Sequence, residues 1–236
     1  GQVTSWMHAG REYLYVRRRP PLEECDSTPS RPHDVFPQIG REGPLPQHGL
    51  LRTREWSVAE QDEARATLRI TDDAETRALW PHHFLAELLV SLEDGLVVRL
   101  RITNSDASPF SFTAALHTYF AVDDVKHARI FGLRNERYVD KTLSPLRSVD
   151  RDPAVRITAA IDRVYTFGPR YLRLAGLGAR YDLDLETDGF GDWVVWNPWA
   201  EETATLSDME PDDFRRMLCV ESARIAAPVT LGPGAA

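Results

Sequence analysis

The sequence predicts an all-β protein built as a large antiparallel β-sandwich with one or two short helices. Strand-like runs recur along the chain, turn residues separate them, and helix-like periodicity is scarce. Many short strands with turn residues between them are typical of sandwiches and barrels. The chain has 236 residues, of which 42% are hydrophobic, so it can bury a sizeable core.

The clearest strand prediction is the run from Leu96 to Ile102, where apolar and polar residues alternate. This alternation places Arg99 and Arg101 on the solvent face. A Glu-Asp-Gly segment at 93–95 joins this run to the imperfectly alternating run 84–90, and its glycine supplies the positive φ that a hairpin turn needs. Further strand-like runs are 67–71, 110–120, 128–133, 155–160, 171–175, 181–185 and 193–196.

Two segments depart from the strand pattern. The segment from Pro211 to Met217 predicts a short helix, because proline and acidic residues come first and arginines follow. The segment from Arg17 to Gly49 is rich in proline, glycine and charge, which predicts a long irregular loop. No internal repeat or linker divides the sequence, so we predict one domain over residues 1–236.

Composition excludes several classes of function. The net charge of −8 argues against a nucleic-acid partner, while a few local arginines could still hold a small anionic substrate. No apolar run approaches ~18 residues, so we expect no membrane span. The two cysteines, Cys25 and Cys219, lie far apart and favour a reduced, cytoplasmic compartment. No signal peptide is visible, but the chain opens at Gly1 without an initiating methionine, so a lost targeting segment stays an open alternative.

The residues suited to chemistry gather in a few short segments, and each is ambiguous by itself. A single histidine in an apolar strand, such as His117, is more often a satisfied core residue than a catalytic one. Glu221 follows the apolar run 217–220, so its carboxylate needs a partner or a raised pKa. A salt bridge to an arginine explains Glu221 as well as catalysis does.

The other segments allow the same two interpretations. Asp162 and Arg163 read as a plain ion pair, and Arg52 with Arg54 as a solvated charged edge. The tryptophans of the Trp-Asn-Pro-Trp segment 196–199 suit core packing better than a platform for a sugar ring.

Taken together, five segments in order resemble the aldose 1-epimerase superfamily, and in particular its glucose-6-phosphate 1-epimerase (D-hexose-6-phosphate mutarotase) branch. They are Pro-Gln-His-Gly at 46–49, Leu-His-Thr-Tyr-Phe at 116–120, Asp-Arg-Val-Tyr at 162–165, Trp-Asn-Pro-Trp at 196–199 and Cys-Val-Glu at 219–221. The resemblance runs from about Val3 to about Gly234. It implies a galactose mutarotase-like supersandwich with a concave sugar site, no metal and no organic cofactor. It also implies one or two strands ahead of Ser5, which we expect this chain to lack.

Residue by residue, the resemblance matches His117 to the catalytic acid and Glu221 to the catalytic base. The positions that match substrate-binding residues are Arg31, Gln47, His48, Arg52 and Asp162. The sequence departs from the family pattern around Arg31, where Pro-His-Asp-Val follows in place of Gly-Gly-Ile-Pro. It departs again after Glu221, where Ser-Ala-Arg stands in place of Ala-Gly-Asn.

These matches predict a monomeric isomerase that interconverts the α and β anomers of a hexose 6-phosphate. Its expected partner is that small-molecule substrate, with no nucleic acid and no membrane. Two alternatives stay open. The altered segment around Arg31 keeps open a non-catalytic sugar-phosphate-binding or regulatory module on the same fold. The third hypothesis is an epimerase of an unphosphorylated aldose.

Overall fold

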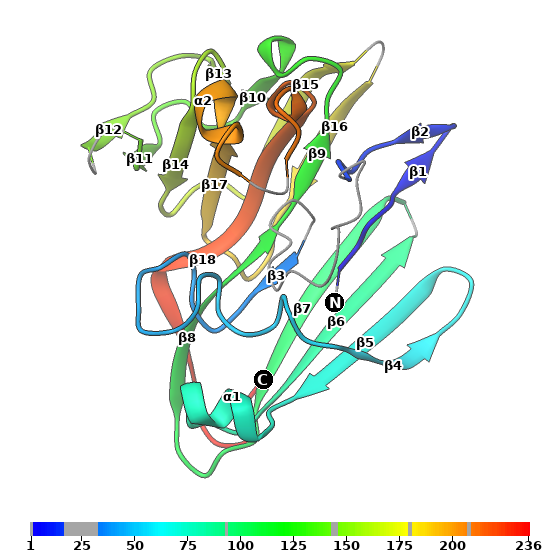
Figure 1. The fold of residues 1–236 in the computed structure, drawn as a ribbon, viewed down its shortest axis with the longest axis vertical. Coiled ribbons are helices and arrows are strands. Elements are labelled where there is room, and N and C mark those ends of the chain that lie inside the picture. Colours follow the sequence, from blue (N-terminus) through cyan, green and yellow to red (C-terminus); the bar gives the residue numbers. More distant parts are fainter. Residues whose placement is uncertain (1, 17–32, 93, 143–145, 179–180, 207–208) are drawn as a thin grey trace. The chain divides into compact units, whose positions relative to one another are not determined.

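A computed structural model describes residues 2–16, 33–92, 94–142, 146–178, 181–206 and 209–236 (Figure 1). The described residues form two compact units. Unit 1 holds residues 2–3, 33–116 and 227–236, and unit 2 holds residues 4–16 and 117–226, apart from the gaps given above. Arg31 lies outside the described residues.

Unit 1 contains a four-stranded antiparallel sheet in the order β4 (Ser57–Gln61), β5 (Arg65–Thr71), β6 (Phe84–Leu92) and β7 (Leu96–Asn104) (Figure 1). The predicted hairpin is confirmed, because β6 pairs with β7 up to the turn and the Arg99 and Arg101 side chains are exposed. The positive φ expected at Gly95 is wrong, because the glycines with a positive φ lie elsewhere in the described chain and this turn forms without one. The helix α1 (Ala74–Leu79) joins β5 to β6. The strand-based prediction missed it, although Asp73 and Thr76 form a capping box at its start.

The rest of unit 1 is built on β3 (His33–Val35), β8 (Phe110–His117, of which 110–116 belong to this unit) and the last residues of β18 (Met217–Leu231). A hydrogen bond of 2.7 Å joins Ser111 to Thr230. The ring of Phe36 lies 5.2 Å from that of Phe84 and 5.0 Å from that of Phe112, which gives the unit an aromatic core. The prediction of an irregular loop through Gly49 is therefore wrong at β3, whose three residues are all buried.

Unit 2 is a sandwich of two antiparallel sheets. One sheet runs in the order β12 (Leu146–Val149), β11 (Arg137–Asp140), β14 (Ile161–Tyr165), β17 (Asp192–Asn197) and β18, and β9 (Tyr119–Ala121) also pairs with β18. The other runs in the order β13 (Ala154–Arg156), β10 (Arg129–Phe131), β15 (Tyr171–Gly178) and β16 (Tyr181–Glu186). The strands β1 (Met7–His8) and β2 (Arg11–Glu12) form a separate short ladder.

The core of unit 2 lies between these two sheets. Ile130 and Leu174 from one sheet and Val195 and Val220 from the other belong to a single buried hydrophobic cluster. Side chains alternate along a strand, so the residues between them on β17 and β18 project from the opposite face. The fold class predicted from the sequence, an all-β antiparallel sandwich, is confirmed.

Two predicted elements differ from the structure. The helix expected at 211–217 is reduced to a 3₁₀ turn, η2 (Asp213–Arg215), and Met217 instead opens β18 and pairs with Ala121. The single strand expected at 110–120 breaks at Thr118 into β8 and β9. Two short helices complete the described chain, α2 (Trp199–Thr203) and the 3₁₀ turn η1 (Val125–His127). Among the described residues, no helix has the length and apolar character that crossing a bilayer requires.

Candidate active site

Strand register in unit 2 places several chemically useful side chains on one face of the sheet. Glu221 on β18 pairs with Val194 on β17, and two residues before it Cys219 pairs with Trp196. Trp196 pairs in turn with Asp162 on β14. Residues paired across antiparallel strands share a face. The side chains of Glu221, Cys219, Trp196 and Asp162 therefore project from the face opposite the sandwich core.

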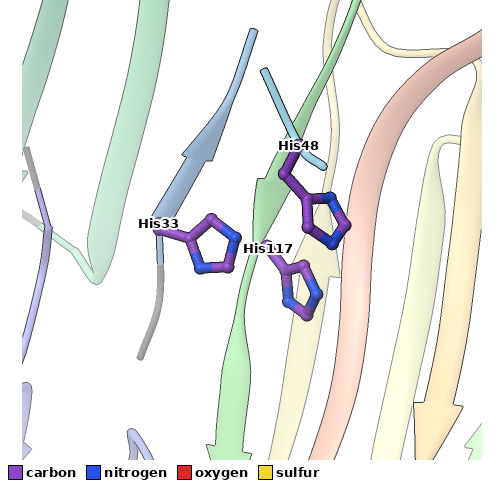
Figure 2. Close-up of side chains that lie close together, drawn as sticks. All are labelled: His33, His48 and His117. Carbon is purple, nitrogen blue, oxygen red and sulfur yellow. The ribbon is translucent and has the colours of Figure 1, made fainter. Parts of the chain in front are cut away.

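His117 and Glu221 meet on this face. The imidazole Nε2 of His117 lies 3.2 Å from Oε1 of Glu221, and the two side chains are only 8% and 6% exposed. His117 is the last residue of β8, and Figure 2 shows its ring on that strand. The ring of Tyr119 stacks on the imidazole at 4.8 Å with an interplanar angle of 11°. An imidazole and a carboxylate are thus held in direct contact, away from bulk water.

The surroundings of Glu221 favour its protonated form. Burial raises the pKa of Glu221 well above its ordinary value, and the negative charge of Asp162 raises it further. The ammonium group of Lys141 acts in the opposite direction. Glu221 therefore holds a proton more readily than an exposed glutamate does, and the neighbouring imidazole of His117 can also give and accept protons.

Cys219 adds a third donor beside this pair. Its sulfur, a ring nitrogen of His117 and a carboxylate oxygen of Glu221 lie within 4.8 Å of one another, a donor set that a borderline-soft divalent ion could use. Burial raises the pKa of the Cys219 thiol well above its ordinary value, and the negative charge of Glu221 adds to this shift. The thiol therefore keeps its proton at neutral pH, and a metal would have to displace it before binding.

The Trp-Asn-Pro-Trp segment positions α2 next to this face. The Asn197 side chain accepts the N–H of Trp199 at 2.9 Å and donates to the carbonyl of Met217, also at 2.9 Å. Trp199 packs on Phe214 at 5.2 Å, as the core interpretation of the sequence predicts. The helix carries Glu202, whose pKa is raised by partial burial and by the charge of Asp162. Sequence reasoning missed Glu202, because it belongs to none of the five segments that resemble the family.

Asp162 and Arg163 do not form the plain ion pair that the sequence favoured. Arg163 projects from the other face of β14 and forms salt bridges with Asp140 at 3.1 Å and Asp150 at 3.2 Å. The hydroxyl of Tyr165 donates to Asp150 at 2.9 Å. Alternate residues of this segment therefore serve different purposes, with Asp162 on the face of Glu221 and Arg163 in a structural network.

In unit 1, the predicted residues Gln47 and His48 lie on a tight loop beside β3. The rings of His48 and His33 meet edge to face at 5.5 Å (Figure 2), and Nε2 of Gln47 lies 3.5 Å from Nε2 of His48. His33 is buried and was not selected from the sequence, since the loop prediction gave it no strand neighbour. Gly49 completes the loop with a φ of +76°, at a point where a Cβ atom would lie 2.1 Å from the carbonyl oxygen of Phe36.

Arg52 and Arg54 follow this loop and have different surroundings. Arg54 is bound by Asp73 at 2.6 Å and Glu75 at 3.1 Å, which makes it part of a solvated charged edge. Arg52 takes part in neither of these salt bridges and is partly exposed.

Comparison with known proteins identifies the family. The sequence profile of the family described as Aldose 1-epimerase matches residues 33–236. The chain belongs to the aldose 1-epimerase family. The resemblance inferred from the five sequence segments is therefore confirmed.

Among relatives of this aldose 1-epimerase family member, a protein from Cenchrus ciliaris is 32% identical over 248 residues, which cover 99% of this chain and 75% of the relative. A protein from Escherichia coli strain K12 is 27% identical, with 94% of this chain and 76% of the relative covered. Both carry the provisional name glucose-6-phosphate 1-epimerase. The crystal structure of a provisionally named mutarotase from Salmonella typhimurium shares the fold, with a TM-score of 0.88, 24% identity, and coverage of 99% of this chain and 80% of that one.

Proposed function

We propose that this member of the aldose 1-epimerase family interconverts the α and β anomers of a hexose 6-phosphate. The observation that carries the proposal is the buried contact of 3.2 Å between the His117 imidazole and the Glu221 carboxylate. Family membership supports a carbohydrate isomerase, and the provisional names of the relatives support the phosphorylated substrate.

The reaction needs two proton transfers around one carbon. To open a pyranose ring, the anomeric hydroxyl must lose a proton while the ring oxygen gains one. Both oxygens are bonded to the anomeric carbon, so an acid and a base must act within a few ångströms of each other. General acid–base catalysis of this kind contributes about 10²–10⁴-fold in rate.

In this proposal Glu221 is the base toward the anomeric hydroxyl and His117 is the acid toward the ring oxygen. Rotation about the bond between the first two carbons of the open chain presents the other face of the aldehyde, and ring closure then reverses both transfers. Because ring closure returns both protons, Glu221 ends ionised and His117 ends protonated, as at the start of the cycle. The raised pKa of Glu221 strengthens it as a base once it is ionised.

The remaining predicted residues are proposed as substrate contacts. Asp162 lies on the face of Glu221 and would accept a sugar hydroxyl. Gln47 and His48 would bond further hydroxyls, and Arg52 and Arg31 would hold the phosphate, because a guanidinium matches the geometry of phosphate oxygens.

Exchange NMR between the anomers tests the proposal. We expect the protein to accelerate the exchange of glucose 6-phosphate, and Glu221→Gln and His117→Asn each to lower that acceleration by about 10²–10⁴-fold. Matched controls are Glu186→Gln on β16 and His127→Asn on η1, both exposed and outside the strands that carry the contact, and both should keep the exchange rate of the wild type.

Each alternative has its own outcome. Binding of glucose 6-phosphate without accelerated exchange would favour the non-catalytic module. Equal acceleration of free glucose would favour an epimerase of unphosphorylated aldoses. Near wild-type exchange in either active-site variant, with the fold intact by circular dichroism, would remove the assigned roles.

A further inference from the structure

A groove of about 920 Å³ opens on unit 2 away from the acid–base pair. Its walls come from β11, β12 and the turn that follows β14. The lining residues used below are Asn135, Arg137, Arg147, Ser148, Thr166 and Phe167. None of these residues takes part in the proposed chemistry.

The register of the sheet fixes how the groove relates to Glu221. Val194, which pairs with Glu221, also pairs with Val164 on β14. Val164 pairs with Val139 on β11, and Val139 pairs with Arg147 on β12. Arg147 therefore shares a face with Glu221 but lies four strands away, about 19 Å at the usual spacing between strands. A hexose 6-phosphate is shorter than this, and the groove lining includes neither Glu221 nor His117, so the two places are separate.

The groove presents two arginines, Arg137 and Arg147, beside one acidic lining residue, Glu136. Arg137 pairs across the ladder with Val149, and Arg147 with Val139, so both arginines project from the same face and both are exposed. Neither forms an ion pair with any residue that the structure describes. Arg163, on the other face of the neighbouring strand, is held by two carboxylates. In a chain with a net charge of −8, two such arginines side by side favour an anionic ligand.

The rim of the groove carries an exposed aromatic ring in an unusual conformation. Phe167 is 71% exposed and has a φ of +56°, which a bulky side chain rarely adopts. The conformation is imposed by Asp192, which is 1% exposed and accepts the N–H of Phe167 at 2.9 Å. The same carboxylate accepts two N–H groups of β18, at Ile225 and Ala226. A strained residue that its surroundings hold so firmly is a common feature of binding sites.

We propose that this groove is a second site for a sugar phosphate, separate from the acid–base pair. The apolar C–H face of the sugar lies on the Phe167 ring, and Arg137 and Arg147 bind the phosphate. The amide of Asn135 and the hydroxyl of Thr166 bond the sugar hydroxyls. This inference does not depend on the proposed catalytic function.

Shift mapping by NMR tests the second site on the full chain. Titration with glucose 6-phosphate should shift the amide signals of Ser148, Thr166 and Phe167, whatever happens to anomer exchange. The double variant Arg137→Ala/Arg147→Ala should weaken this binding by about tenfold or more, since hydrogen bonds between charged groups are lost. The control Arg156→Ala, an exposed arginine of β13, should leave the Kd unchanged.

Phe167 variants separate the sugar contact from the phosphate contact. Phe167→Gly removes the ring and suits the positive φ, so binding should weaken while stability in urea holds or rises. Phe131→Ala removes an exposed ring of β10 and serves as the matched control. The proposal is overturned if glucose 6-phosphate leaves the three amides unshifted, if inorganic phosphate binds as tightly as glucose 6-phosphate, or if the arginine and Phe167 variants bind as the wild type does.

Discussion

Burial and two charged neighbours, Asp162 and Lys141, shift the pKa of Glu221, and their effects differ in sign. Burial and Asp162 both raise its pKa, whereas Lys141 lowers it. His117, at 3.2 Å, is the group that can take the proton. The electrostatic role of Asp162 can therefore be tested apart from any contact with substrate.

We predict that Asp162→Asn moves the acid limb of the pH–rate profile to lower pH. Removing the negative charge of Asp162 lowers the pKa of Glu221, so the carboxylate form that acts as base persists to lower pH. The measurement is kcat/KM for anomer exchange as a function of pH. Asp188→Asn, an exposed residue in the turn before β17, should leave the profile in place. An unshifted limb in Asp162→Asn would contradict this role.

At the residue scale, the sequence predicted part of the site. The apolar run before Glu221 indicated a buried carboxylate that needs a partner or a raised pKa, and Glu221 has both. The partner of Glu221 is His117, which the end of β8 and the register of β18 bring into contact with it. A local sequence pattern reveals neither of these two features. The same limit applies to Cys219, whose neighbours come from distant segments. The roles of the predicted site residues remain predictions.

At the scale of the elements, the loop that carries Gln47 and His48 depends on a close contact between its own backbone at Gly49 and the backbone carbonyl of Phe36. The N–H of Leu50 donates to the carbonyl of Phe36 at 2.7 Å, and Gly49 lies against that same carbonyl. There is no room for a side chain at this point. The loop can therefore form only with glycine at position 49.

We predict that Gly49→Ala destabilises the protein by about 2 kcal/mol or more, because it combines a positive φ with a clash against backbone. The comparison is Gly40→Ala, which has a φ of +58° but no atom within 4 Å of the added Cβ. That variant should cost about 1 kcal/mol. Urea unfolding of both variants measures the difference, and equal losses would show that the contact with Phe36 is unimportant.

The sequence predicted some strands and missed others, for physical reasons. Alternation identified β6 and β7 because one face of each is solvated. It did not identify β18 as a strand, because its first five residues are all buried and show no alternation. The segment 211–217 has residues that suit the two ends of a helix. Its last residue, Met217, instead pairs with Ala121 as part of β18, so the full helix does not form. Tertiary contacts overrode local propensity there.

For the whole molecule, two buried carboxyl groups link folding to pH. Asp34 on β3 is 3% exposed, and burial raises its pKa to about 7. Glu221 is buried as well, and its pKa is also raised. An unfolded chain would ionise both groups near their ordinary values. At a pH between the pKa of the unfolded chain and the higher pKa of the folded protein, each group is ionised in the unfolded chain and protonated in the folded protein. Folding therefore takes up protons in this pH range.

We predict that the free energy of unfolding falls as pH rises from about 4 to 7. Below pH 4 Asp34 is protonated in both states, and between pH 4 and 7 only the unfolded chain ionises, so stability is lost. A shift from 3.8 to about 7 corresponds to roughly 4 kcal/mol. Urea unfolding across this pH range measures the slope. Asp34→Asn should flatten it, and an unchanged slope would contradict the assignment.

The sequence predicted one domain over residues 1–236, and this stays a prediction. The described residues form two compact units. Sequence patterns indicate which segments are strands, but the grouping of strands depends on contacts between distant residues. The fold class needed only the strands and turns, so it was predictable. The division into units was not.

Strand β18 limits how the chain can change in length. Leu218 and Val220 belong to the sandwich core, while Cys219 and Glu221 face the other way. Insertion or deletion of one residue just before Glu221 would reverse this alternation, placing a carboxylate among hydrocarbon side chains and a valine beside His117. A change of two residues would preserve it. In descendants of this gene, length changes inside the strand should therefore occur in even steps, and odd steps should be confined to the turns that flank it.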